Sequence, residues 1–270
     1  MRPRSLFVIL LLAAASHAET KKAQPLVIGE TFTIHSTVLN EDRRINVYLP
    51  PAYTASADAR LPVLYMPDGG IGEDFLHVAG LVQVSTGNAT MRPFLLVGIE
   101  NTERRRDMTG PTVIESDKKI APRVGGSAKF RAFLRNELMP AVEKRYRVTK
   151  ERAIVGESLA GLFVVETMLL EPELFDTYIA FDPSLWWNDE HLVKSASELL
   201  HTHPPAGRTL YIATSNEPGI VGPAQRFIES LRTEKIDRFR WQYEPMPEET
   251  HGTIYHPAAL RAFRRLFAPQ

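Results

Sequence analysis

The sequence contains no cysteine among its 270 residues. This absence excludes disulfide bonds, thiol catalysis and metal sites built from cysteine. An excess of charge of one sign is also missing, because 32 Lys and Arg residues balance 32 Asp and Glu residues. We therefore expect no nucleic-acid partner. No group of histidines and carboxylates has the spacing of a metal site, so we expect neither a metal nor another cofactor.

Long apolar runs are lacking except near the N-terminus. Arg2 and Arg4 precede the apolar run 6–15, and Ser16-His17-Ala18 places small residues at the two positions that a signal peptidase reads. The run is too short to span a membrane. We predict that residues 1–18 are a signal peptide cleaved before Glu19, and that the protein is periplasmic or secreted without stable membrane insertion. The alternative is an uncleaved anchor.

Residues 19–270 fit one large α/β domain better than two small ones. Apolar segments of strand and helix type alternate along the chain, which favours a mostly parallel sheet covered by helices on both faces. The expected strands are Thr31–Leu39, Arg44–Leu49, Val63–Met66, Phe94–Ile99, Ala153–Val155, Thr177–Phe181, Leu210–Ala213 and Phe239–Tyr243.

Helical periodicity fills most of the remaining sequence. The expected helices are Glu73–Val84, Ser127–Tyr146, Leu159–Leu170, Asp189–Leu200, Pro223–Lys235 and Pro257–Phe267. Pro140 should kink the second of them, because proline removes a backbone donor and clashes with the preceding turn. The stretch Asn101–Gly126 has neither period, and long irregular loops of this kind are usually functional or mobile.

The strongest local signal surrounds Ser158. An apolar strand leads into Gly156-Glu157-Ser158-Leu159-Ala160-Gly161, and an apolar helix follows. A sharp strand-to-helix turn of this kind exposes a strained nucleophilic serine, and it needs small neighbours because strand and helix approach closely. We predict that Ser158 is the nucleophile of an α/β-hydrolase. The alternative is a serine that only caps a buried helix.

A nucleophilic serine needs a base and an acid that orients it, and in this fold both follow the serine in the chain. His251 lies between the last strand and the last helix, where the fold carries its base; we prefer it to His256. Glu217 is the first carboxylate after the strand 210–213, and we predict that it is the acid. Asp182, one strand earlier, is the alternative, and a serine–histidine dyad without an acid is the third possibility.

The oxyanion hole should combine two backbone amides. One is the N–H of Leu159 at the start of the helix after the nucleophile. The other should come from the glycine-rich loop after the third strand, from Gly70 or Ile71. Glycines let the backbone approach a ligand closely, although the loop would also serve as a plain turn.

These residues resemble the esterase-D-like family of α/β-hydrolases over nearly all of residues 19–270. Four segments carry the resemblance. Val63–Gly70 is similar to the family's strand with its Asp-Gly turn, and Val97–Thr109 is similar to its "VGI…R.RD.T" loop. Gly126–Tyr146 is similar to the helix before the nucleophile, and Asp182–Trp187 to the segment "SPSLWW". The last segment is most similar to the branch with siderophore trilactone esterases, although Asp182 stands where that segment has serine.

The resemblance implies a serine esterase that acts on a small-molecule carboxylic ester. Ferric catecholates are anionic and aromatic, so Arg106 would bind their charge and Trp186 and Trp187 would stack on their rings. The alternative is that the arginines are solvated and the tryptophans belong to the core. A general carboxylesterase, an S-formylglutathione hydrolase and a non-catalytic binding protein are the other functions to test. The sequence leaves the oligomeric state open.

Overall fold

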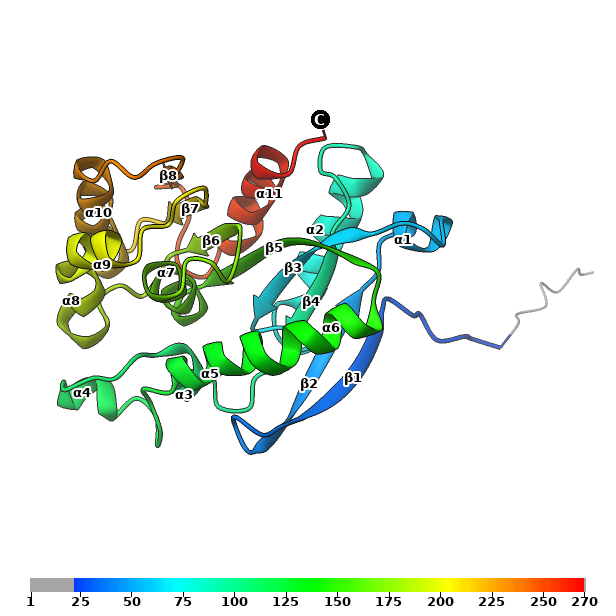
Figure 1. Cartoon of the computed structure of the whole chain (residues 1–270), viewed down its shortest axis with the longest axis horizontal. Coiled ribbons are helices and arrows are strands. Elements are labelled where there is room, and N and C mark those ends of the chain that lie inside the picture. The colour runs from blue at the N-terminus through cyan, green and yellow to red at the C-terminus, as the bar shows by residue number, and fades with distance from the viewer. Residues whose placement is uncertain (1–21, 270) are drawn as a thin grey trace, which may run out of the picture.

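The computed structural model describes residues 22–269, and the predicted signal peptide lies outside them. One eight-stranded sheet runs through the protein in the order β1-β2-β4-β3-β5-β6-β7-β8 (Figure 1). The first two strands pair antiparallel, β2 pairs antiparallel with β4, and all other pairs are parallel. The strands are β1 Glu30–Ser36, β2 Glu41–Tyr48, β3 Leu61–Pro67, β4 Leu95–Ile99, β5 Val148–Glu157, β6 Thr177–Phe181, β7 Thr209–Thr214 and β8 Arg240–Pro245.

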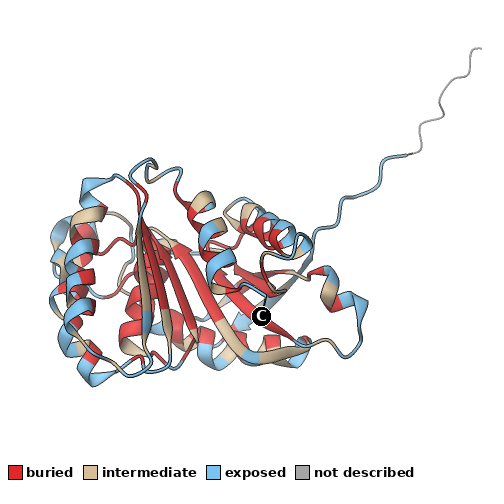
Figure 2. Cartoon of the chain, turned by 90° about the horizontal axis from the view of Figure 1, so that it is seen from above, coloured by how far each residue is buried: buried red, intermediate tan, exposed pale blue. Residues whose placement is uncertain are grey.

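Helices cover both faces of the sheet, as predicted. Figure 2 shows buried strands at the centre and helices that expose one side to solvent. The α-helices are α1 Pro51–Ala55, α2 Phe75–Gly87, α3 Arg104–Met108, α4 Glu115–Lys118, α5 Ser127–Phe133, α6 Met139–Arg145, α7 Leu159–Leu170, α8 Trp187–Lys194, α9 Ala196–Thr202, α10 Pro218–Thr233 and α11 Tyr255–Leu266. Within residues 22–269, no helix has the length and apolar character needed to cross a membrane.

Side chains of the central strands alternate between two apolar cores. In β3, Val63 and Tyr65 belong to the apolar core that includes α5, α7, α9 and α10, whereas Leu64 and Met66 belong to the core that includes α2 and α11. This alternation follows from the two-residue period of a strand. A sheet covered on both faces explains why β3, β4 and β6 are mostly apolar and buried at every residue.

The predicted disturbance before Pro140 is a π-helical turn, η1, at Leu134–Leu138. It lies between α5 and α6, with Pro140 in the first turn of α6. A proline lacks the N–H of a regular helix, and the wider turn before it makes room for its ring. The helix therefore continues past the proline through α5, η1 and α6, which are drawn in green in Figure 1.

The segment 101–126 is more ordered than the sequence indicated, because it contains α3 and α4. A buried ion pair fixes it to the sheet. Arg43 of β2 is fully buried and donates to Asp107 of α3 at 2.5 Å, and also to the Glu100 carbonyl at 3.1 Å. A buried charge is tolerated when it is paired in this way. The pair holds α3 at the edge of the sheet where β4 ends.

Candidate active site

Ser158 occupies the sharp turn between β5 and α7, as predicted. Its backbone has φ 62° and ψ −119°, a strained combination for a residue with a side chain. Two close approaches explain the glycines beside it. A methyl group on Gly156 would lie 2.7 Å from Ala160, and one on Gly161 would lie 2.9 Å from the Phe181 carbonyl. The turn therefore depends on small residues at both positions.

His251 reaches Ser158 from the loop between β8 and α11. Its Nε2 lies 3.1 Å from Ser158 Oγ, within hydrogen-bond distance. The predicted pairing of these two residues is therefore present. The alternative base, His256, lies in α11 and packs against His77 with 5.5 Å between ring centroids. Its pKa is lowered, chiefly by burial and also by His77.

The structure brings Asp182, and not Glu217, to His251. Asp182 Oδ2 lies 2.9 Å from His251 Nδ1, and its Oδ1 accepts a 2.6 Å hydrogen bond from the Ser215 N–H. Asp182 is fully buried, whereas Glu217 is exposed and stands at the start of α10. The prediction of Glu217 as the acid is wrong in geometry. The reason is strand order: β6, which ends at Asp182, pairs directly with β5, and β7 lies one strand farther away.

A second carboxylate, not predicted from the sequence, faces the same imidazole nitrogen. Glu157 Oε1 lies 3.3 Å from His251 Nδ1. Burial raises the pKa of Glu157 to about 7, although the charges of His251 and Arg104 oppose the rise. The pKa of His251 is raised, chiefly by the hydrogen bond with Asp182 and further by the charge of Glu157. Only its place beside Ser158 in the chain could have pointed to Glu157.

The two backbone amides proposed for the oxyanion hole belong to the start of α7 and to the loop after β3. Leu159 is the first residue of α7, where backbone N–H groups have no partner inside the helix. The loop after β3 lies next to the turn of Ser158, because β3 pairs with β5. In that loop, the Gly70 N–H is engaged, since it donates to Glu73 Oε2 at 2.7 Å. The Ile71 N–H makes no hydrogen bond within residues 22–269, so it is the available donor of the predicted pair.

An ion pair holds this loop. Asp68 has φ 57° and is nearly buried, and Arg104 of α3 binds it in a bidentate manner at 2.7 and 2.8 Å. The Asn46 side chain donates to the Gly69 carbonyl at 2.8 Å. Bidentate Arg–carboxylate pairs fix orientation as well as distance. The segment 101–126 therefore contributes to the site by positioning the backbone of the β3–α2 loop.

Arg106 does not face the site as a free cation. It donates to Glu41 at 2.7 and 2.9 Å and to Asp107 at 2.7 Å. Its hydrogen bond is the main reason that the pKa of Glu41 is about 2. Its predicted role in substrate binding is therefore not supported by its position. Arg105 is the exposed cation of α3, with no ion pair in the part of the chain that the structure describes, and it lines a hollow of about 390 Å³.

The two tryptophans have different surroundings. Trp187 is buried, and its indole N–H donates to the Gly110 carbonyl at 2.9 Å. It belongs to the core, which is the alternative stated for both residues. Trp186 is 37% exposed and lies 6.0 Å from Trp187 between ring centroids. Trp186 is therefore the one of the pair that a ligand can contact.

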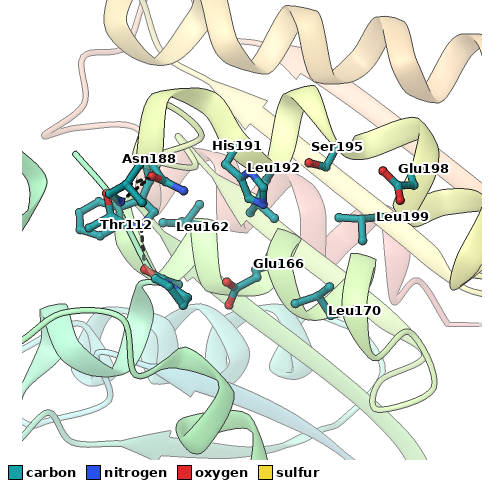
Figure 3. A pocket seen from close by; sticks show the side chains of 14 residues that line it. Thr112, Leu162, Glu166, Leu170, Asn188, His191, Leu192, Ser195, Glu198 and Leu199 are labelled. Carbon is teal, nitrogen blue, oxygen red and sulfur yellow. Dashed lines mark hydrogen bonds between the residues drawn. The ribbon is translucent and has the colours of Figure 1, made fainter.

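A larger hollow of about 490 Å³ lies behind the nucleophile, between α7, the α8–α9 segment and residues 110–113 (Figure 3). Leu162 and Leu170 of α7 form one side, and Leu192 and Leu199 the other. Asn188 closes one end, since its side-chain oxygen accepts from Thr112 Oγ1 and the Val113 N–H, both at 3.1 Å. Neither Ser158 nor His251 lines this hollow.

Three potential metal ligands meet at the site. Ligand atoms of Glu157, Asp182 and His251 all lie within 4.8 Å of one another. His251 Nε2 faces the serine and Nδ1 faces the two carboxylates. A proton on His251 Nδ1 occupies the position between this nitrogen and the carboxylates that a metal ion would take. Hydrogen bonding therefore explains why the three side chains lie close together. That catalysis needs no metal stays a prediction.

Known proteins resemble this chain in sequence and fold. A family model described as "Putative esterase" matches residues 36–251. Ferri-bacillibactin esterase BesA of Bacillus subtilis is 32% identical over 195 residues, which are 64% of this chain and 66% of the relative. The chain thus spans slightly less than two thirds of that relative's length.

Solved structures extend the likeness. An IroE-like serine hydrolase from Shewanella oneidensis superposes with a TM-score of 0.81 at 28% identity, over 88% of this chain and 80% of that one. The enterobactin esterase FES from Shigella flexneri has a TM-score of 0.69 at 17% identity, over 90% of this chain and 59% of that one, and shows the fold alone. With the α/β-hydrolase sheet and the family model both present, the chain belongs to this family of esterases.

Proposed function

We propose that this protein is a serine esterase that cleaves the ester bonds of iron-loaded catecholate siderophores of the trilactone class. The observation that carries the proposal is the continuous contact from Ser158 to His251 to Asp182, built on a strained strand-to-helix turn. Such a chain of nucleophile, base and acid performs acyl transfer on several unrelated folds.

Each residue then has a defined step. His251 Nε2 accepts the Ser158 hydroxyl proton while Ser158 Oγ attacks the ester carbonyl. The N–H groups of Leu159 and Ile71 stabilise the oxygen that becomes negative. The protonated imidazole gives its proton to the departing alcohol, which leaves an acyl-serine. A water molecule, activated by the same nitrogen, then releases the acid and restores Ser158.

Asp182 acts through His251. Its carboxylate accepts a hydrogen bond from the Nδ1–H group, which fixes the tautomer that leaves Nε2 free to accept a proton. It also stabilises the imidazolium formed during attack. Catalysis requires neutral His251, so activity falls as pH decreases through the pKa of that residue. Because the hydrogen bond with Asp182 raises this pKa, the loss of activity begins at a higher pH than for an isolated histidine.

The substrate class rests on the relatives and on two exposed side chains. The relative from Bacillus subtilis is named for a ferri-bacillibactin substrate. Within residues 22–269, Arg105 makes no ion pair and offers a positive charge at the surface of α3, and Trp186 offers a partly exposed ring. A ferric tris-catecholate is anionic and aromatic, so both contacts suit it. The charge of Arg105 therefore favours an anionic ligand over a neutral one.

The test compares substrates on purified protein with and without the nucleophile. The wild type should hydrolyse an iron-loaded trilactone faster than p-nitrophenyl butyrate, feruloyl ester or S-formylglutathione at equal concentration. Ser158→Ala should stay folded and lose on the order of 10⁴-fold in kcat, because removing the nucleophile leaves only binding and the oxyanion donors.

Other outcomes change the proposal in defined ways. Activity on p-nitrophenyl butyrate but not on the trilactone would replace the siderophore substrate with a simpler ester. No hydrolysis, together with no fluorophosphonate label on Ser158, would mean a binding protein. A folded Ser158→Ala variant with a tenth of wild-type activity would overturn the serine mechanism.

A further inference from the structure

We propose that Glu157 is a second carboxylate for the catalytic base, a positioning residue that stabilises His251 together with Asp182 and replaces Asp182 when that residue is lost. The inference rests on the proposed hydrolysis by Ser158 and extends it to a group that the mechanism above does not use. The geometry that carries it is the approach of two carboxylates to one nitrogen, with Nδ1 2.9 Å from Asp182 Oδ2 and 3.3 Å from Glu157 Oε1.

The two carboxylates have different roles because Nδ1 carries a single proton. Asp182 takes that proton in a directed hydrogen bond, and its other oxygen is held by the Ser215 N–H. Glu157 lies at ion-pair distance from the same nitrogen, without such a hydrogen bond. Its contribution is therefore the attraction between its negative charge and the imidazolium that forms when Ser158 gives up its proton.

The backbone explains why Glu157 has this position. It is the last residue of β5, directly before the strained turn at Ser158. Glu157 also pairs with Phe181 in the register of β5 and β6, and Asp182 follows Phe181. The two carboxylates are thus neighbours across adjacent strand ends. In this structure, the turn that presents Ser158 to His251 also brings Glu157 to the same imidazole.

Several other charges face this pair, and they set its titration. Arg104 of α3 favours the charged form of Glu157, whereas Asp182 and Asp74, the latter in the β3–α2 loop, disfavour it. Glu217 at the start of α10 acts on His251 at longer range. Burial is the largest influence on Glu157 and raises its pKa to about 7, while the pKa of His251 is raised chiefly by its hydrogen bond with Asp182. The two groups therefore titrate as a coupled pair.

The test is a double-mutant cycle with the variants Glu157→Gln, Asp182→Asn and the double variant. Glutamine keeps the size of Glu157 and removes its charge. The loss in kcat from Glu157→Gln should be at least about threefold larger in the Asp182→Asn background than in the wild type, because Glu157 is then the remaining carboxylate at Nδ1. Equal losses in both backgrounds would overturn the proposal.

Glu217→Gln provides the matched control, since it also removes a carboxylate that acts on His251 but one that is exposed and makes no contact with Nδ1. Its effect should be the same with Asp182 and with Asn at position 182. If Glu217→Gln shows the same coupling as Glu157→Gln, general electrostatics and not the close approach of Glu157 explains the result, and the proposal fails.

A second measurement does not depend on hydrolysis. Nuclear magnetic resonance of the His251 ring should show a lower pKa in Glu157→Gln than in the wild type, because the imidazolium loses a nearby negative charge. An unchanged pKa in Glu157→Gln, or in Glu157→Ala if the glutamine variant does not fold, would contradict the proposal. If the wild type shows no Ser158-dependent hydrolysis, the proposed function fails, and this titration still decides the role of Glu157.

Discussion

Replacing Asp182 by asparagine tests which acid orients the base. Asparagine keeps the shape of the side chain and can still accept the Ser215 N–H through its oxygen. Its amide group would then face His251 Nδ1 with a donor in place of an acceptor. His251 would be driven toward the tautomer with its proton on Nε2, and that nitrogen could not accept the proton of Ser158.

The magnitude follows from the distance and the burial. Asp182 is fully buried and lies 2.9 Å from Nδ1. Two unit charges at this range attract by about 6 kcal/mol at an effective dielectric constant near 20. That energy corresponds to about four powers of ten in rate. Because Glu157 remains at 3.3 Å, we expect Asp182→Asn to lower kcat by roughly 10²- to 10³-fold, with KM changed by less than about threefold.

The assay is the steady-state hydrolysis of p-nitrophenyl butyrate, with circular dichroism and the thermal midpoint Tm as checks on folding. Glu217→Gln is the control, and it should change kcat by less than about threefold because this residue is exposed and does not contact the imidazole. A large kcat loss in Glu217→Gln, or a folded Asp182→Asn variant with a third of wild-type activity, would refute the assignment of Asp182.

Two further predictions concern the base and the flank of the site. His251→Ala should lower kcat by on the order of 10⁴-fold, whereas His256→Ala, which alters only the contact with His77, should retain at least about a third of the activity in the same assay. Arg105→Ala should raise KM for an iron-loaded anionic trilactone but not for neutral p-nitrophenyl butyrate. Arg123→Ala is the control and should raise KM for the trilactone less, because the Arg123 cation is paired with Glu103. Equal changes in KM for both substrates would contradict an electrostatic role of Arg105.

Features with a local cause could be predicted from the sequence. The turn at Ser158 needs small residues within a few positions, and both Gly156 and Gly161 are as crowded as expected. The disturbance before Pro140 follows from the chemistry of one residue, and it appears as η1. The central strands β3, β4 and β6 are mostly apolar because both of their faces are buried. Each of these signals acts over a few residues, so no knowledge of the fold was needed to find them.

The partners of charged and aromatic side chains depend on contacts between distant segments. Arg106 looked available for a ligand, but Glu41 of β2 binds it across 65 positions of sequence. Trp187 looked equivalent to Trp186, but the Gly110 carbonyl holds its indole in the core. Arg105, between two paired arginines, is the one left exposed. Composition shows that a charge or a ring is present, and only the folded chain shows whether it is free.

The acid illustrates the same limit in the site itself. From the sequence alone we prefer Glu217 to Asp182, although each follows a strand later than β5. The order of strands decides between them, since the end of β6 lies directly beside Ser158 and the end of β7 lies one strand away. That order is fixed by the packing of the whole sheet. The same strand order places the end of β5 beside Asp182. Glu157 and Asp182 therefore both lie near the same nitrogen of His251.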